Sequence, residues 1–323
     1  MGKILITGVA GFIGAKTAEM LLELGNEVIG IDNINDYYDV RVKQYRLEGL
    51  KAKRGFVFYQ SDIEDIVFIE ALANTYRIDA VINLAARAGV RYSLQVPHLY
   101  MSTNVMGTLN LLEVMRHKGI NKFVLASTSS LYAGHPLPFK EDAPVNRPIS
   151  PYAASKKAAE AIAYSYHHLY GIDVSVLRYF TVYGPAGRPD MSPFRFIKWI
   201  DEGYPIELYG DGSQRRDFTY IDDIARGTVS ALKTVGYEII NLGGGKGPYS
   251  MNQLIEKIEL LLGKKATINY MPFHRADMTE TGADISVAKE LLNWQPEVSL
   301  EEGLEETVRW HVNNRHWIKE IRP

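Results

Sequence analysis

The stretch Thr7-Gly8-Val9-Ala10-Gly11-Phe12-Ile13-Gly14 joins a short apolar run, Lys3–Thr7, to a segment with helical spacing, Phe12–Leu24. Its glycines are spaced three apart, which allows a tight turn and lets a phosphate approach the backbone at the helix N-terminus. Strand-to-helix turns also use such glycines for purely steric reasons. The stretch predicts a strand, a turn and a helix. Its candidate cofactor-binding residues are Gly8, Gly11, Phe12, Ile13 and Gly14.

The alternation of strand and helix continues through the first 180 residues. Strands are expected at Lys3–Thr7, Glu27–Asp32, Phe56–Gln60, Ala80–Leu84, Phe123–Ala126 and Val174–Tyr179. Helical spacing occurs at Phe12–Leu24, Ile66–Tyr76, Tyr100–His117 and Ala153–Tyr170. This order predicts a parallel sheet with helices on both faces, the Rossmann-type doubly wound α/β fold.

After about residue 180 the alternation breaks up and proline and glycine become frequent, as at Gly184, Pro185, Gly187, Pro189 and Pro193. We expect residues 1–180 to form the dinucleotide-binding domain and residues 181–323 to form mainly a smaller substrate-binding portion. Residues 238–242 are expected to return a strand to the main sheet.

Composition narrows the class of partner. The 36 lysines and arginines nearly balance the 38 aspartates and glutamates, so nothing favours nucleic acid or an anionic membrane. No cysteine is present, which excludes disulfides and cysteine-ligated metals; we expect no metal site and a reducing, cytoplasmic location. The apolar run at Ile4–Ile6 is too short for a signal peptide or a membrane span.

Two acidic positions point to the kind of cofactor. Asp32 ends the second strand 18 residues after Gly14, where an acid is expected to bind the ribose hydroxyls and to repel a 2′-phosphate. Asp62 and Ile63 follow the third strand and are placed to meet the adenine. A turn residue at the end of a strand is the alternative interpretation of Asp32. The set predicts NAD rather than NADP.

A second constellation carries acid–base chemistry. Tyr152 and Lys156 are four residues apart at the start of a helix, so phenol and ammonium share one face. The fifth strand ends in Ser127-Thr128-Ser129-Ser130, hydroxyls at the edge of the sheet where ligands bind, although they could also only satisfy loop backbone. A phenol needs a nearby cation to act as a base, and Thr128 would hydrogen-bond the reacting oxygen. The predicted catalytic residues are Thr128, Tyr152 and Lys156.

These motifs resemble the extended short-chain dehydrogenases/reductases of the nucleotide-sugar epimerase type. Nearly the whole chain is covered, with later matches at 178–185, 215–223 and 283–296. Within that superfamily, Ala88-Gly89-Val90-Arg91-Tyr92-Ser93 and the segment 180–191 resemble UDP-glucuronic acid 4-epimerases. The resemblance implies tightly bound NAD, a UDP-sugar substrate and a homodimer formed through helices Tyr100–His117 and Ala153–Tyr170.

The resemblance also assigns site residues. For the cofactor it adds Asn33, Leu84, Ala85, Ala86, Asn104 and Phe180 to Asp32, Asp62, Ile63, Tyr152 and Lys156. For the substrate it implies Arg91, Ser93, Thr128, Ser129, Ser130, Thr181, Arg188, Tyr209, Arg216 and Asp277. Of these, Ser129, Ser130 and Thr181 are expected to hold the sugar carboxylate. An ion pair with Asp217 or Asp222 is the alternative for Arg216, and ordinary packing is the alternative for Tyr209.

Several positions depart from the pattern of these epimerases. Arg87 stands where glutamine is usual, Ala186 where tryptophan is usual and Ala133 where glycine is usual. His274-Arg275-Ala276-Asp277 replaces a glycine-containing turn, which leaves open whether His274 or Arg275 meets the phosphates.

The residues beside Thr128 choose among reactions. Dehydratases of the superfamily have Asp-Glu after the threonine, and decarboxylases acting on UDP-glucuronate have glutamate at the position of Ser130. Serine at both positions favours 4-epimerisation of UDP-glucuronate and UDP-galacturonate. The alternatives are a UDP-glucose or UDP-N-acetylglucosamine 4-epimerase, a UDP-glucuronate decarboxylase, and an NAD-binding regulatory protein without chemistry.

Overall fold

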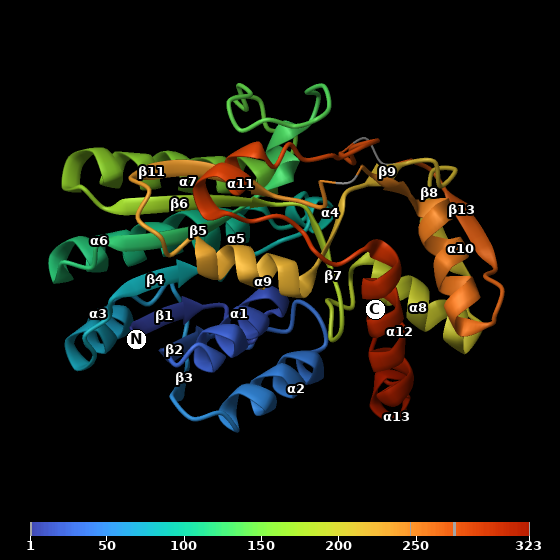
Figure 1. Ribbon diagram of the computed structural model, residues 1–323, viewed down its shortest axis with the longest axis horizontal. Helices are drawn as coiled ribbons and strands as arrows, with labels where there is room; N and C mark the ends of the chain where they lie inside the picture. Colours follow the sequence, from blue (N-terminus) through green and yellow to red (C-terminus); the bar gives the residue numbers. More distant parts are fainter. Residues whose placement is uncertain (1, 246, 274–275, 323) are drawn as a thin grey trace.

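A seven-stranded parallel sheet forms the centre of the computed structural model, which describes residues 2–245, 247–273 and 276–322 (Figure 1). Its spatial order is β11-β6-β5-β4-β1-β2-β3. The strands are β1 (Lys3–Thr7), β2 (Glu27–Asp32), β3 (Phe56–Gln60), β4 (Ala80–Asn83), β5 (Lys122–Thr128), β6 (Asp173–Tyr179) and β11 (Tyr237–Leu242). The order reverses between β1 and β4, and ligands bind at such a switch point.

Helices cover both faces of this sheet because successive side chains of a strand point to opposite sides. Ile4 and Ile6 of β1 belong to one core cluster and Leu5 belongs to the other. The first cluster includes residues of α1 (Phe12–Glu23), α2 (Val40–Lys51), α9 (Ile221–Ser230) and α11 (Ser286–Leu292). The second includes residues of α3 (Ile66–Thr75), α6 (Gly107–Lys118) and α7 (Pro151–Tyr170). The predicted doubly wound fold is confirmed.

Two helical segments differ from the sequence prediction. Helix α2 lies between β2 and β3, where no helix was expected. The helix expected over Tyr100–His117 is interrupted: α5 (Pro97–Met101) is followed by a π-helical segment, Ser102–Met106, before α6 begins. Asn104 lies in that segment. The local widening changes which side chains of the helix face the sheet.

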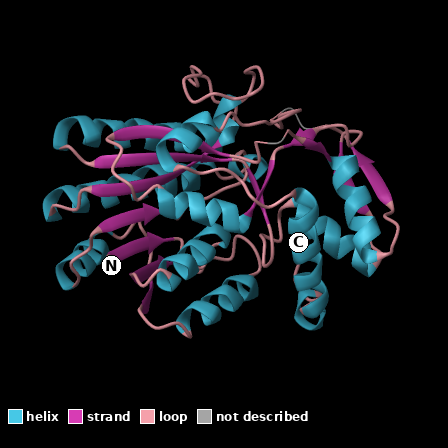
Figure 2. Ribbon diagram, viewed as in Figure 1, coloured by secondary structure: helices cyan, strands magenta, loops and turns pink. Residues whose placement is uncertain are grey.

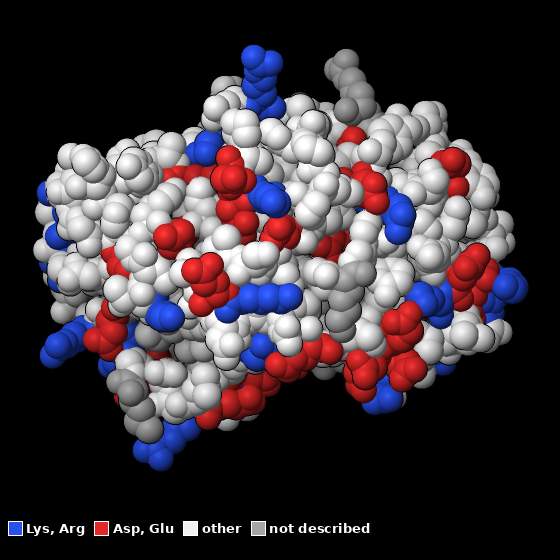
Figure 3. All heavy atoms as spheres, turned by 45° about the horizontal axis from the view of Figure 1, so that its top comes forward, with Lys and Arg blue, Asp and Glu red and all other residues white. Residues whose placement is uncertain are grey.

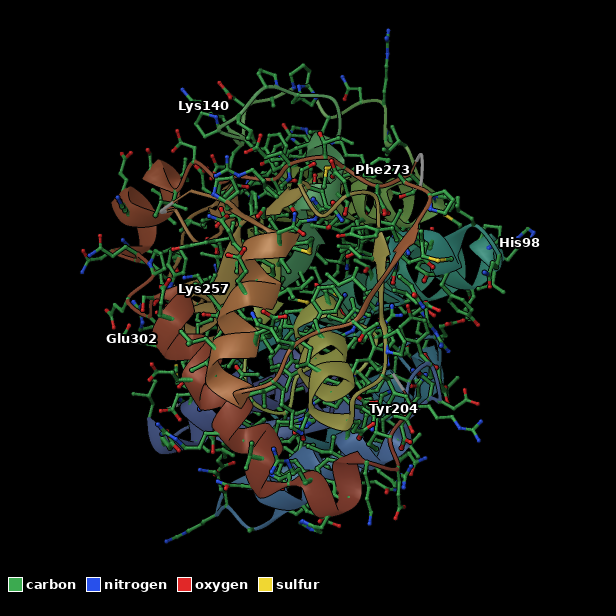
Figure 4. All side chains as sticks on the ribbon, turned by 90° about the vertical axis from the view of Figure 1, so that its right-hand side faces the viewer. His98, Lys140, Tyr204, Lys257, Phe273 and Glu302 are labelled. Atoms are coloured by element: carbon green, nitrogen blue, oxygen red, sulfur yellow. The ribbon has the colours of Figure 1, made fainter. Side chains whose placement is uncertain are left out.

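The C-terminal portion has its own apolar core beside the main sheet. It is built from α8 (Ser192–Glu202), α10 (Met251–Leu262) and α12 (Leu300–Asn313), followed by the short α13 (Arg315–Ile318). Strand β8 (Ile206–Tyr209) pairs in parallel with β13 (Ile268–Met271). Figure 4 shows Tyr204 and Phe273 at opposite ends of this strand pair. Tyr209 therefore lies at the same end as Phe273, the end that borders the site.

Short strands connect the two portions. β7 (Thr181–Tyr183) pairs with β10 (Phe218–Tyr220), and β9 (Arg215–Arg216) pairs with β12 (Tyr249–Ser250). Figure 2 shows these pairs apart from the main sheet, although β7 follows β6 directly after Phe180. Strand β11 returns to the main sheet and pairs with β6, and α9 packs on α1. The division of the chain into residues 1–180 and 181–323 stays a prediction.

The surface carries charges of both signs. In the face drawn in Figure 3, basic and acidic side chains are interspersed, with uncharged areas between them. Among the helices of the described residues, none combines the length and the apolar composition needed to cross a bilayer.

Candidate active site

A cleft of about 690 Å³ opens at the carboxyl ends of the main-sheet strands and reaches into the C-terminal portion. Ligand sites for small molecules measure roughly 300–1,000 Å³, so the cleft has the size of a binding site. The predicted cofactor residues that line it are Gly8, Gly11, Phe12, Ile13, Asp32, Asn33, Asp62, Ile63, Leu84, Ala85, Ala86, Tyr152, Lys156 and Phe180. The predicted substrate residues that line it are Arg91, Thr128, Ser129, Ser130, Thr181, Arg188, Tyr209, Arg216 and Asp277.

Three predicted site residues lie behind the wall of the cleft instead of on it. A Cβ on Gly14 would lie 2.2 Å from the Gly8 carbonyl oxygen, so this glycine lets helix and turn pack closely. Ser93 is buried and donates to the Val90 carbonyl at 2.6 Å. Asn104 accepts from the Arg87 backbone N–H at 2.8 Å and donates to the Arg87 carbonyl at 2.9 Å, so it fixes the loop after β4. His274 and Arg275 lie outside the described residues.

The glycine turn suits an anion. Gly8 has a φ of +69°, and a Cβ there would lie 2.6 Å from the Ala85 backbone nitrogen, so only glycine fits. Helix α1 begins after Gly11 without a side-chain cap. Uncapped N–H groups at a helix N-terminus bind phosphate. These features fit the pyrophosphate of a dinucleotide.

Asp32 ends β2 at the edge of the cleft. Its carboxylate accepts from the backbone N–H of Ala10 at 3.1 Å and from that of Ile34 at 2.8 Å. The carboxylate therefore stabilises the glycine turn, as the turn-residue interpretation expects, and it also lines the cleft. Beside it, Asn33 donates to the Asp62 carboxylate at 2.6 Å.

Thr128, Tyr152 and Lys156 all line the cleft. Thr128 is the last residue of β5, and the other two lie in the first turns of α7, whose N-cap Ser150 accepts from Ala153 N–H at 3.2 Å. The Thr128 hydroxyl also accepts from the Ser130 backbone N–H at 3.1 Å, which fixes the turn that carries the two serines.

Burial governs the titration of Tyr152 and Lys156. It raises the pKa of Tyr152, while the Thr128 hydroxyl and the positive charge of Arg188 oppose that rise. Burial also lowers the pKa of Lys156 to about 8, against the attraction of Glu160. Burial therefore favours the protonated form of the Tyr152 phenol. The cation that favours the phenolate is Arg188, from the segment after β7, a residue that the sequence assigned only to the substrate.

The opposite end of the cleft gathers predicted substrate residues. Arg91 forms an ion pair with Asp277 at 2.5 Å, and its guanidinium carbon lies 3.7 Å from the centre of the Tyr209 ring. Arg216 donates to the Arg215 carbonyl at 2.8 Å and pairs with neither Asp217 nor Asp222. This end combines an aromatic face, a carboxylate and two guanidinium groups.

The cleft also contains residues that the sequence analysis missed. Tyr37 and Lys43 come from the loop after β2 and from α2, and Arg195 comes from α8. Burial lowers the pKa of Lys43 to about 8, against the attraction of Asp32. The Arg195 Nε is buried and has no hydrogen-bond partner among the described residues. The sequence offered one signal for Arg195: it stands between Phe194 and Phe196, two apolar residues that the structure buries. In the described part of the chain, no cluster of His, Asp and Glu could hold a metal.

Comparisons with known proteins agree with this geometry. Residues 5–307 match the model of the family described as GDP-mannose 4,6 dehydratase. A UDP-glucuronate 4-epimerase of Thermodesulfobacterium geofontis is 61% identical over 322 residues, 100% of both chains. The solved UDP-glucuronic acid 4-epimerase of Bacillus cereus, in complex with UDP-glucuronic acid and NAD, is 40% identical with a TM-score of 0.90, covering 96% of this chain and 99% of that one. The UDP-glucose 4-epimerase of Thermotoga maritima, with UDP-glucose, is 33% identical with a TM-score of 0.88, covering 97% and 99%.

Proposed function

This chain belongs to the GDP-mannose 4,6 dehydratase family, and from that premise we propose that it is an NAD-dependent UDP-glucuronate 4-epimerase. It interconverts UDP-glucuronate and UDP-galacturonate through a transient 4-keto sugar and is therefore an isomerase. The observation that carries this proposal is the pair Ser129 and Ser130 beside Thr128 in the cleft, in a chain 61% identical to a UDP-glucuronate 4-epimerase.

NAD is the cofactor. We assign its pyrophosphate to the glycine turn and the uncapped start of α1, and its adenine ribose to the carboxylate of Asp32. The remaining residues assigned to it are Asn33, Asp62, Ile63, Leu84, Ala85, Ala86, Tyr152, Lys156 and Phe180. Asn104 acts through the Arg87 backbone in this proposal. When bound, NAD accepts a hydride from the sugar and later returns it.

Tyr152 is the proposed acid and base. Its phenol takes the proton of the 4-hydroxyl as the carbon is oxidised and returns a proton when the alcohol forms again. Thr128 donates a hydrogen bond to the same oxygen and so holds it against the phenol. Lys156, one helical turn further along α7, adds positive charge on the side of the ribose. The oxidised carbon regains its hydrogen in the same cycle, so no net oxidation results, and because the hydrogen is regained on the opposite face of the keto sugar, the configuration at that carbon is inverted.

Ser129, Ser130 and Thr181 are proposed to hold the sugar carboxylate. The 4-keto intermediate is a β-keto acid, which loses carbon dioxide when the breaking bond aligns with the carbonyl π system. Hydroxyl donors can hold that bond out of alignment and stabilise the carboxylate charge. A glutamate at position 130 would instead repel it.

The nucleotide is assigned to the other end of the cleft. Tyr209 offers its ring face to the uracil, while Arg91 and Arg216 face the diphosphate and Asp277 faces the ribose. This assignment supports a substrate-binding role for residues 181–323 and a cofactor-binding role for residues 1–180 with β11. Arg188 lies between the two sites.

One experiment tests the proposed function. The pure protein is incubated with UDP-glucuronate and the products are identified by NMR. The expected product is UDP-galacturonate, with no net reduction of NAD. UDP-pentose as the main product would identify a decarboxylase. Turnover of UDP-glucose but not of UDP-glucuronate would identify an epimerase for neutral sugars.

We further propose a homodimer in the cytoplasm. Exposed apolar side chains occur on α5, in the π-helical segment and on α7, and surface helices that carry such side chains can pack on a second copy. These side chains are Met101, Met106, Tyr164, Leu169 and Tyr170. The absence of cysteine fits a reducing compartment.

A further inference from the structure

Arg46 of α2 is a buried cation that uses its whole hydrogen-bonding capacity. Its side chain is 7% exposed. Nε and Nη2 donate to the Ala186 carbonyl at 2.9 and 2.7 Å, and Nη2 also donates to the Gly187 carbonyl at 3.1 Å. Nη1 donates to the Ala10 carbonyl at 3.1 Å and to the Tyr38 hydroxyl at 2.7 Å. These contacts use all five N–H donors of a guanidinium.

None of those acceptors is a carboxylate, and Arg46 has no ion pair among the described residues. A buried charge without a counter-ion is costly to the fold. A rigid fork of donors is the property that an arginine offers and that a lysine does not. Its placement against three backbone carbonyls indicates that Arg46 sets the position of the backbone.

The segment that Arg46 grips needs support. Ala186 has a φ of +53°, a left-handed conformation that residues other than glycine rarely adopt. Such a conformation persists where neighbouring contacts over-determine it. The carbonyl of Ala186 accepts two of the five hydrogen bonds. Arg46 therefore holds the segment at the residue with the left-handed backbone conformation.

Two residues further along this segment lies Arg188, the cation beside Tyr152. Its guanidinium donates to the Asp190 carboxylate at 3.0 and 2.6 Å, and its central carbon lies 5.6 Å from the centre of the Tyr37 ring. The charged and titratable groups around Tyr152 are Arg188 from this segment, Lys156 from α7, Tyr100 from α5 and Tyr37 from the loop after β2. A shift of the backbone at 186–187 would move Arg188 within this group.

The other end of the fork reaches the cofactor side. Ala10 lies within the glycine turn, and its own N–H donates to the carboxylate of Asp32. Arg46 therefore joins the turn assigned to the pyrophosphate and the segment that carries Arg188.

We propose that Arg46 is a positioning residue for the epimerase reaction. It fixes the segment 184–190 against the glycine turn so that Arg188 keeps its place beside Tyr152. This inference rests on the proposed function, in which Arg188 belongs to the sugar-binding end of the cleft. Nothing in the chemistry requires Arg46 itself to touch substrate or cofactor.

A double-mutant cycle tests the proposal. Arg46→Lys keeps the charge and removes the fork, and Arg188→Met removes the group through which Arg46 acts. The kcat/KM for UDP-glucuronate is measured in the NAD-loaded wild type, both single variants and the double variant. We expect Arg46→Lys to lower kcat/KM at least roughly tenfold alone and less than about twofold in the Arg188→Met background.

The pH profile supplies a readout that a loss of stability would not move. Arg188 favours the phenolate of Tyr152. Displacing it should therefore shift the acid limb of kcat to higher pH in Arg46→Lys. The limb should stay in place in Lys198→Met, the matched control. Lys198 is also buried and also donates to backbone carbonyls, those of Ile318 and Lys319 at 3.0 Å each, but it lies away from the cleft.

The same fold loss in both backgrounds would overturn the proposal, as would an Arg188→Met variant with wild-type kcat/KM, because Arg46 would then have nothing to act through. If Arg46→Lys does not fold, Tyr38→Phe replaces it. This variant removes one acceptor of the fork and should show the same dependence on Arg188 at smaller size. A wild-type protein that does not turn over UDP-glucuronate would instead refute the proposed function.

Discussion

Tyr152 carries the chemistry at the residue scale, and removing its phenolic oxygen is the most direct test. Tyr152→Phe should lower kcat by roughly a thousandfold, the size expected of a general acid–base group, because phenylalanine can neither accept nor return the proton. Bound NAD, measured by absorbance after denaturation, should be retained. Tyr166→Phe on the same helix, away from the cleft, should keep wild-type activity. Near wild-type turnover in Tyr152→Phe would exclude this tyrosine as the base.

The fate of the carboxylate depends on three hydroxyls. Thr181→Ala or Ser130→Ala removes a charge-assisted hydrogen bond of roughly 1.5–3 kcal/mol, while Thr128, Tyr152 and Lys156 remain to oxidise the sugar. The ratio of UDP-pentose to epimer should therefore rise in both variants. Product NMR against the wild type decides this, and an unchanged ratio would mean that the hydroxyls do not protect the carboxylate.

The candidate site was predictable where chemistry needs residues close in sequence. Tyr152 and Lys156 share a helix turn, Thr128 ends a strand, and Ser129 and Ser130 follow it directly, so the pattern alone brings these residues to one sheet edge. Contacts between distant segments left no such signal. The pairing of Arg91 with Asp277 joins residues 186 apart. The burial of Asn104 behind the cleft depends on its partner, the Arg87 backbone, which no local spacing reveals.

At the scale of elements, the strands were predictable because buried parallel strands read as short apolar runs. Helix α2 was not, because its buried face includes Lys43 and Arg46 and therefore lacks an apolar stripe. The interruption between α5 and α6 leaves the apolar spacing on both sides intact, so the sequence reads as one helix. The spacing of apolar residues along the sequence detects neither a helix whose buried face is polar nor a local change of helix type.

The contact between α8 and α12 should depend on pH. Burial lowers the pKa of His311 to about 4, although Asp201 lies 3.2 Å from its Nε2, since Arg315 already pairs with the same carboxylate. The unfolded chain, with the usual histidine pKa, binds a proton at higher pH than the folded protein. The stabilisation is therefore present above about pH 6.5 and is lost as the pH falls toward 4.

Denaturation in urea measures this loss. Between pH 7.5 and pH 5 the folded wild type should lose roughly 2 kcal/mol through His311. His311→Gln, which can still donate to Asp201, should lack that part of the pH dependence. The same slope in both proteins would show that folding does not lower the pKa of His311.

At the scale of the whole molecule, the apolar surface on α5 to α7 predicts self-association. Light scattering after gel filtration should give twice the chain mass of 36.4 kDa. Leu169→Glu together with Tyr170→Glu places charges on that surface and should yield monomers, whereas Leu260→Glu, at a side chain 84% exposed on α10, should not. A monomeric wild type would show that there is no such interface. A double variant that still dimerises would show that the interface lies elsewhere.

The place of β11 beside β6 has a consequence for synthesis. When only the first 180 residues have left the ribosome, β6 is an unpaired edge strand of an incomplete sheet, and it can pair with any other extended chain. This edge is covered when Tyr237–Leu242 leaves the ribosome, and α9, which lies on α1, precedes that strand by only a few residues. The sheet therefore stays incomplete until the second half of the chain has been made, and a species with such an unpaired strand is prone to aggregate.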